Sequence, residues 1–167
     1  MRRLSLIAAA FAAMTFIPAA HAQQQSTSPA PPPAPPYGTP ITLEQAKKVA
    51  VAAEAYARAH NLTEAIAIVE PSGTLVYFFK MDGTQYAGGN VALDKATSAA
   101  IFRRPTTAFE GALRGGNLYV FNLRGMNAVP GGVPIIFEGK LIGGIGASGG
   151  TGQEDTATVE AGVAALK

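Results

Sequence analysis

The chain has 167 residues, of which 13 are lysine or arginine and 11 are acidic, and it contains no cysteine and no tryptophan. The absence of cysteine excludes a disulfide framework, so the packing of side chains must stabilise the fold. Cleavage of the expected N-terminal signal removes two arginines and no acid, which leaves 11 basic and 11 acidic residues. A nucleic-acid or anionic-membrane function therefore lacks an electrostatic basis.

The first 22 residues have the features of a cleavable secretory signal peptide. A basic pair at residues 2 and 3 precedes an apolar run over residues 4 to 18, and Ala20-His21-Ala22 offers a small-residue cleavage site. The apolar run is short for a membrane span. We therefore expect cleavage after Ala22, a periplasmic or secreted location and no membrane insertion of the mature chain.

Residues 23 to 40 are rich in proline and contain almost no side chain that could form a core. This composition predicts an extended, disordered linker. Residues 41 to 167 remain as one domain, which is large enough to bury a core of its own.

The first half of this domain is predicted to be a helix followed by a hairpin. Thr42 and Gln45 form a capping-box pattern, and the apolar stripe behind them predicts a helix that ends near Asn61. Residues 65–69 and 74–79 are rich in β-branched and aromatic side chains, and the Pro-Ser-Gly sequence between them predicts a tight turn.

The second half is predicted to contain two helices, a second hairpin and a last helix. A helix over residues 90–102 is stopped by Pro105, and Thr107 with Glu110 forms the capping box of a short helix. The glycine-rich segment 113–128 predicts a loop with one helical turn.

Strands 134–137 and 141–147 flank Glu138-Gly139-Lys140 and should lie beside the first hairpin. The final helix starts near Gly152, with acids in its first turn. The predicted order is α-ββ-αα-ββ-α. This order indicates an α/β (α+β) fold with an antiparallel sheet of two hairpins, flanked by helices on one or both faces.

Two short motifs suggest chemistry that their context does not support. Residues 144–149 match G-x-G-x-x-G, but no later strand carries the acid that a dinucleotide ribose needs, so these glycines are better explained by close backbone packing. Residues 146–150 match G-x-S-x-G, but no histidine follows Ser148 to act as its base. We identify no catalytic residue.

His60 is the one histidine that remains after signal cleavage. It could ligate a haem iron, but its place in the last turn of a helix also suits an interaction with the exposed carbonyls there. A single histidine without cysteine gives no support to a zinc site.

Four blocks of sequence, taken together and in order, resemble the GlcG/HbpS-like family of small haem-binding proteins. They are Met81-Asp82-Gly83, the run from Lys95 to Ala100, Pro105-Thr106 and the run from Gly143 to Thr151. The resemblance covers about residues 41 to 167, and Ser98 departs from the usual alanine. It implies a profilin-like domain, a homo-oligomer and haem as the cofactor. Some family members are described as haem-degrading or as partners of membrane sensors.

The resemblance also implies where haem would bind. Thr106 is the position that matches the residue implicated at the iron, with His60 as the alternative ligand. Apolar walls would come from Phe102 and Phe109, and the haem propionates would meet Lys95, Arg103 or Arg104. Two other interpretations remain open: Thr106 is an ordinary helix N-cap, and the two arginines are a solvated helix end.

These observations leave three functions open. The first is an exported haem-binding protein. The second is an enzyme of the same family that degrades haem or acts on a small metabolite, and the third is an accessory protein of a membrane sensor. The lack of a visible acid, base or nucleophile favours binding over catalysis.

Overall fold

Four antiparallel strands form one sheet in the order β2-β1-β4-β3. The strands are β1 (Ala65–Val69), β2 (Leu75–Lys80), β3 (Gly132–Phe137) and β4 (Lys140–Ser148). The computed structural model describes residues 33 to 167, so the expected signal peptide and residues 23–32 of the expected linker lie outside the described residues. The two predicted hairpins are confirmed, and they lie side by side through the pairing of β1 with β4.

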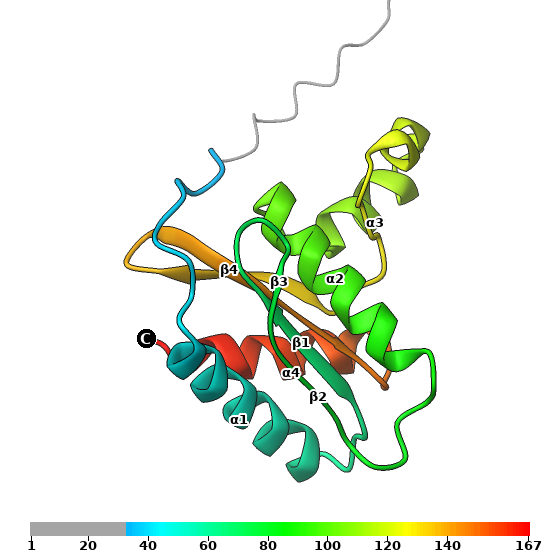
Figure 1. The fold of residues 1–167 in the computed structure, drawn as a ribbon. Helices are drawn as coiled ribbons and strands as arrows, with labels where there is room; N and C mark the ends of the chain where they lie inside the picture. The colour runs from blue at the N-terminus through cyan, green and yellow to red at the C-terminus, as the bar shows by residue number, and fades with distance from the viewer. Residues whose placement is uncertain (1–32) are drawn as a thin grey trace, which may run out of the picture. The chain divides into compact units, whose positions relative to one another are not determined.

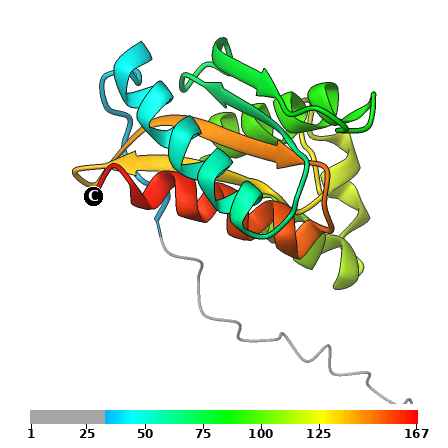
Figure 2. The same ribbon diagram turned by 90° about the horizontal axis from the view of Figure 1, so that it is seen from below.

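Helices cover both faces of this sheet. They are α1 (Leu43–Ala59), α2 (Gly88–Phe102), α3 (Thr107–Arg114) and α4 (Gly152–Ala164). A 3-10 helix, η1 (Leu118–Asn122), follows α3. Figure 1 shows the arrangement, and Figure 2 shows α1 and α4 together in front of the sheet. The predicted α-ββ-αα-ββ-α order is confirmed.

The alternation of side chains along β1 explains the three layers. Ile66 and Ile68 belong to the core shared with α1 and α4, whereas Ala65, Ala67 and Val69 belong to a second core shared with α2. Because β1 is buried on both faces, it reads as a continuous apolar run.

Two glycines of β4 bring α2 unusually close to the sheet. A Cβ atom at Gly146 would stand 2.1 Å from the Ala92 carbonyl oxygen, and one at Gly144 would stand 2.5 Å from that of Ala96. No side chain fits at either position. The glycine-rich motif is therefore needed for helix-to-sheet contact, as its sequence context predicted.

Both capping boxes of the first and last helices are present. The Thr42 and Gln45 pair caps α1, which ends at Ala59, slightly before the predicted position. Thr151 and Glu154 cap α4 in the same way. The Glu154 pKa is lowered because its carboxylate accepts hydrogen bonds from the backbone and side chain of Thr151.

The folded unit begins before residue 41, because residues 36–41 form a strap along β4. The Gly38 amide donates to the Leu141 carbonyl over 2.7 Å, and the Leu141 amide donates to the Pro36 carbonyl over 2.8 Å. Tyr37 forms a parallel bridge with Leu141. Residues 36–40, expected as part of a disordered linker, are thus ordered in the structure, because the part of β4 before Gly144 is not paired with β1 and supplies partners for their backbone.

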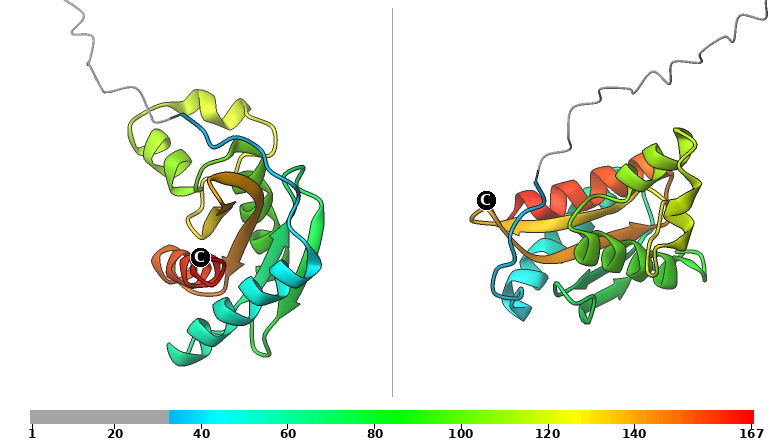
Figure 3. Two further views of the ribbon diagram at one scale, coloured as in Figure 1. Left: turned by 90° about the vertical axis from the view of Figure 1, so that its left-hand side faces the viewer. Right: turned by 90° about the horizontal axis from the view of Figure 1, so that it is seen from above.

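Residues 106–127, here called the arm, project from the end of the layered body (Figures 1 and 3). Its two helices, α3 and η1, pack against each other, and η1 is the single helical turn predicted within residues 113–128. None of the helices within residues 33–167 is both long and apolar enough to cross a membrane.

Candidate functional site

Thr106 joins the start of the arm to the sheet. It is fully buried, its amide donates to the Gly132 carbonyl over 3.0 Å, and its hydroxyl accepts from the Gly132 amide over 3.1 Å. Thr106 occupies the N-cap position of α3 but makes no side-chain capping bond. The capping box predicted for Thr107 and Glu110 is wrong, because Thr107 is already the first residue of the helix.

An aromatic and arginine cluster lies next to Thr106. The rings of Phe102 and Phe109 meet edge to face with centroids 5.1 Å apart, and the Arg104 guanidinium stands 5.7 Å from the Phe109 centroid. Arg104 is exposed, Phe102 is half-buried and Phe109 is buried. The corner between α2 and α3 therefore brings together four of the residues that the sequence placed in one site.

Arg103 turns away from this cluster. Its left-handed backbone, with φ of 54°, ends α2 and directs the side chain to the strap. There the guanidinium stands 4.9 Å from the Tyr37 ring centroid and donates to the Pro35 carbonyl over 3.2 Å. The two neighbouring arginines therefore contact different parts of the protein. Arg103 contacts Tyr37 and Pro35, and Arg104 contacts the Phe109 ring.

Lys95 is not a surface cation. Its side chain is 1% exposed, and the ammonium donates to the Asp155 carboxylate over 2.7 Å and to the Ala147 carbonyl over 2.9 Å. In the structure a buried carboxylate occupies the ammonium, so the expected contact of Lys95 with a haem propionate would require this pair to open. Gly131 and Gly132 leave the space for the Lys95 side chain and backbone.

Glu64 was not recognised in the sequence as a residue of interest. It precedes β1, is fully buried, and neither carboxyl oxygen has a hydrogen-bond partner. Burial above all, and then the negative Asp155 beside it, raise its pKa to about 7, against the opposing effects of the Thr158 hydroxyl and Lys95. An acid placed directly before a wholly apolar strand is the one feature of the sequence that could have drawn attention to it.

His60 lies at the end of α1 and has the structural role expected of a helix end. Its Nδ1 lies 2.8 Å from the Tyr56 carbonyl oxygen, and its ring stacks on that of Tyr56 with centroids 4.0 Å apart. It borders a cavity of about 290 Å³ together with Leu62 and residues of the first turns of α4. The residues that line this cavity include none from the cluster around Phe109.

The arm presents the largest run of exposed apolar side chains in the described part of the chain. Leu118, Tyr119 and Phe121 are each about two-thirds exposed, at 65%, 66% and 67%. The arm together with the preceding Arg103-Arg104-Pro105, residues 103–127, contains four arginines and a single acid, Glu110. Residues 103–127 are therefore both apolar and positively charged, whereas the rest of the mature chain has seven basic and ten acidic residues.

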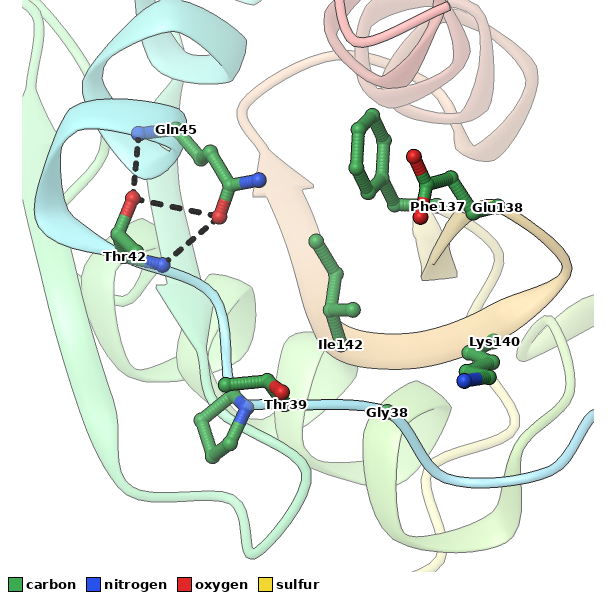
Figure 4. A pocket seen from close by; sticks show the side chains of 9 residues that line it. Gly38, Thr39, Thr42, Gln45, Phe137, Glu138, Lys140 and Ile142 are labelled. Atoms are coloured by element: carbon green, nitrogen blue, oxygen red, sulfur yellow. Dashed lines mark hydrogen bonds between the residues drawn. The ribbon is translucent and has the colours of Figure 1, made fainter.

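A second cavity is lined by other parts of the chain, within residues 38–45 and 137–142. A cavity of about 280 Å³ is enclosed by the strap, the N-terminus of α1 and the turn between β3 and β4 (Figure 4). Phe137 and Ile142 give it an apolar wall, and Thr42 and Gln45 give it a polar one. None of the residues predicted to bind a cofactor lines it.

Ligands of a protein-built metal site are not grouped anywhere in residues 33–167: no three His, Asp or Glu side chains lie together.

The groove between α3 and α4, which Thr107, Glu110 and Glu160 help to line, has a volume of about 250 Å³. This volume is below the range of about 300–1,000 Å³ usual for ligand pockets. This groove alone is therefore too small to enclose a large ligand.

A family model described as haem degrading protein HbpS-like matches residues 41–164. Among curated proteins, an uncharacterised 15.0 kDa protein from Citrobacter freundii is 34% identical over 124 residues, which is 72% of this chain and 87% of that protein. The protein GlcG from Escherichia coli is 28% identical over 108 residues, which is 65% of this chain and 81% of GlcG.

Solved structures share the fold. A double mutant of HbpS from Streptomyces reticuli superposes with a TM-score of 0.72 at 28% identity, over 83% of this chain and 99% of that one. A structure described as a complex of PduOC with haem superposes with a TM-score of 0.70 at 22% identity, over 77% of this chain and 96% of that one. The second likeness shows the fold alone.

Proposed function

The chain belongs to the HbpS-like family, and from this premise we propose that it is an exported haem-binding protein that holds haem on its arm. The family description supports a haem-related function. The observation that carries the proposal is the combination of exposed apolar side chains with arginines on one projecting segment.

The chemistry of haem matches this segment. Haem has a flat apolar ring and two carboxylates, so it needs apolar contact area and cations at one edge, and it supplies an iron that takes axial ligands. Leu118, Tyr119 and Phe121 offer apolar area, and Arg104 and Arg124 are exposed cations. Phe109, which is buried within the arm, and Phe102 at the end of α2 are the predicted apolar wall.

Thr106 remains the proposed oxygen ligand of the iron. Its hydroxyl is buried and already accepts a hydrogen bond from Gly132, so ligation would replace that bond. The exposed apolar side chains and arginines match the haem ring and its propionates well. The buried Thr106 hydroxyl, which already accepts a hydrogen bond, is a poorer match for the iron. The His60 alternative would place haem beside Tyr56 and α4 instead.

A titration of the mature protein with haem tests the proposal. We expect a saturable shift of the Soret band. Phe121→Ala should weaken binding by roughly tenfold or more, because burying a phenylalanine side chain is worth about 1.5–3 kcal/mol. Val51→Ala on α1, where the side chain is 64% exposed, is the matched control and should bind haem normally.

Haem degradation is the second candidate function, favoured by the description of the family model. It is distinguished from binding by turnover of the bound haem when a reductant is added, beyond the peroxide-driven background. Export and a sensory role extend the proposal. The exported chain should begin at Gln23, and a membrane sensor that depends on this protein should be captured with it.

A further inference from the structure

Glu64 is a buried acid without a visible partner. Its side chain is fully buried at the start of β1, both carboxyl oxygens lack hydrogen bonds, and the nearby Thr158 hydroxyl lacks one as well. Buried polar groups in folded proteins are nearly always hydrogen-bonded. A group of three orphaned oxygens therefore requires an explanation.

The groups that face Glu64 come from three elements. Asp155 and Thr158 approach from α4, and Lys95 acts from α2. After β2, the Met81 sulfur accepts from the Glu64 amide over 3.5 Å and adds no charge. One buried ammonium thus serves two carboxyl groups, and it is bonded to Asp155.

We propose that Glu64 and Asp155 share one proton inside the domain, and that its release to water as the pH rises through neutrality loosens the turn before α4. In this arrangement neutral Glu64 donates its proton to the Asp155 carboxylate, and a small rotation of the side chains lets its other oxygen accept from the Thr158 hydroxyl, which has no partner in the structure. All three orphaned oxygens are then satisfied, and Lys95 balances a single negative charge. The raised pKa of Glu64 agrees with this arrangement.

Asp155 transmits the change to the turn. Its Oδ1 accepts from the Gly150 amide over 2.9 Å, and its Oδ2 accepts from Lys95. A second negative charge on Glu64 repels Asp155 and competes for Lys95. The bond to Gly150 is the contact in the network closest to solvent, because Gly150 is exposed, so it should open first.

The sign of the pH effect follows from proton binding. Between pH 5 and 7 the folded chain keeps the Glu64 proton that the unfolded chain has lost, because the pKa is about 7 folded and 4.5 in the reference state. The stabilisation from this proton is complete below about pH 4.5 and is lost as the pH approaches 7. The ratio of folded to unfolded protein should therefore fall on the order of a hundredfold between pH 5 and pH 8 because of this group.

Denaturant unfolding of the full chain at pH 5 and pH 8 tests the proposal. Glu64→Gln, which stays neutral and can still donate to Asp155, should remove most of this fall. Glu160→Gln, an exposed acid on α4, should keep it. An equal pH dependence in the wild type and in Glu64→Gln would overturn the proposal.

Two measurements on the wild type keep the test valid if Glu64→Gln does not fold. Infrared spectra should show a protonated carboxyl band at pH 5.5 that disappears by pH 8. Hydrogen exchange, corrected for its intrinsic pH dependence, should show lower protection of the Gly150 amide at pH 8. Absence of the carboxyl band, or unchanged protection of Gly150, would also refute the shared proton.

Discussion

Thr106 and Lys95 both hold elements together through buried polar contacts. Thr106, at the start of α3, is hydrogen-bonded to Gly132, the first residue of β3. Lys95 of α2 forms a buried ion pair with Asp155 of α4. Removing one partner of such a contact is costly, because the other is left buried and unpaired.

Thr106→Val should lower the melting temperature by several degrees. Valine keeps the shape of the side chain but leaves the Gly132 amide without its acceptor, which costs about 1–3 kcal/mol. Thr106→Ser keeps the hydroxyl and should lose less. Thermal unfolding followed by circular dichroism measures both, and a wild-type melting curve for the valine variant would show that the bond contributes nothing.

The same pair of variants tests Thr106 as the iron ligand. At a temperature where both variants are folded, ligation predicts a changed haem spectrum with valine and a wild-type spectrum with serine. A wild-type spectrum with valine would leave Thr106 as a purely structural residue and move the search for the ligand to His60.

At the scale of single residues, the proximity of site residues was predictable only where the chain itself brings them close. Phe102, Arg104, Thr106 and Phe109, which the family resemblance implied for one site, lie within eight positions of one another. The partners of Lys95 and Glu64 were missed, because Asp155 reaches them only after the last helix folds back on the sheet. No local sequence pattern predicts such a contact.

Among the elements, the strap is the one that the sequence analysis did not predict. Residues 36–41 have the composition of a linker, but the first residues of β4, which β1 does not reach, give them backbone partners. The helices and strands themselves followed from periodicity, capping residues and turn sequences. Their boundaries shifted by a few residues, because the ends of helices depend on local hydrogen bonds.

A chain that begins at residue 41 should be less stable than one that begins at residue 33. It loses both backbone bonds between the strap and Leu141 and the contact of Tyr37 with Arg103. Each backbone bond contributes about 0.5–1.5 kcal/mol, so the melting temperature should fall by several degrees. Equal melting temperatures for the two chains would indicate that the strap is only loosely attached.

The whole molecule combines an alanine-rich core with an exposed apolar arm. The core against α2 consists of alanines and one valine, and large apolar side chains remain exposed on the arm and on β2, where Phe78 is 41% exposed. Apolar surface of this kind usually marks a contact site. The proposed homo-oligomer would cover part of it.

Light scattering at micromolar concentration should therefore give a mass of several mature chains. Phe121→Ser should shift the mass toward that of a single chain if the arm forms the contact. A single-chain mass for the wild type would contradict oligomerisation and leave the arm free for haem alone.

The central claim is that haem binds on the arm. The most direct measurement is the broadening of backbone amide signals by paramagnetic ferric haem in nuclear magnetic resonance spectra of the mature protein. We predict that broadening centres on residues 102–106 and 118–124. Broadening centred on Tyr56 and His60, or no broadening at saturating haem, would contradict the claim.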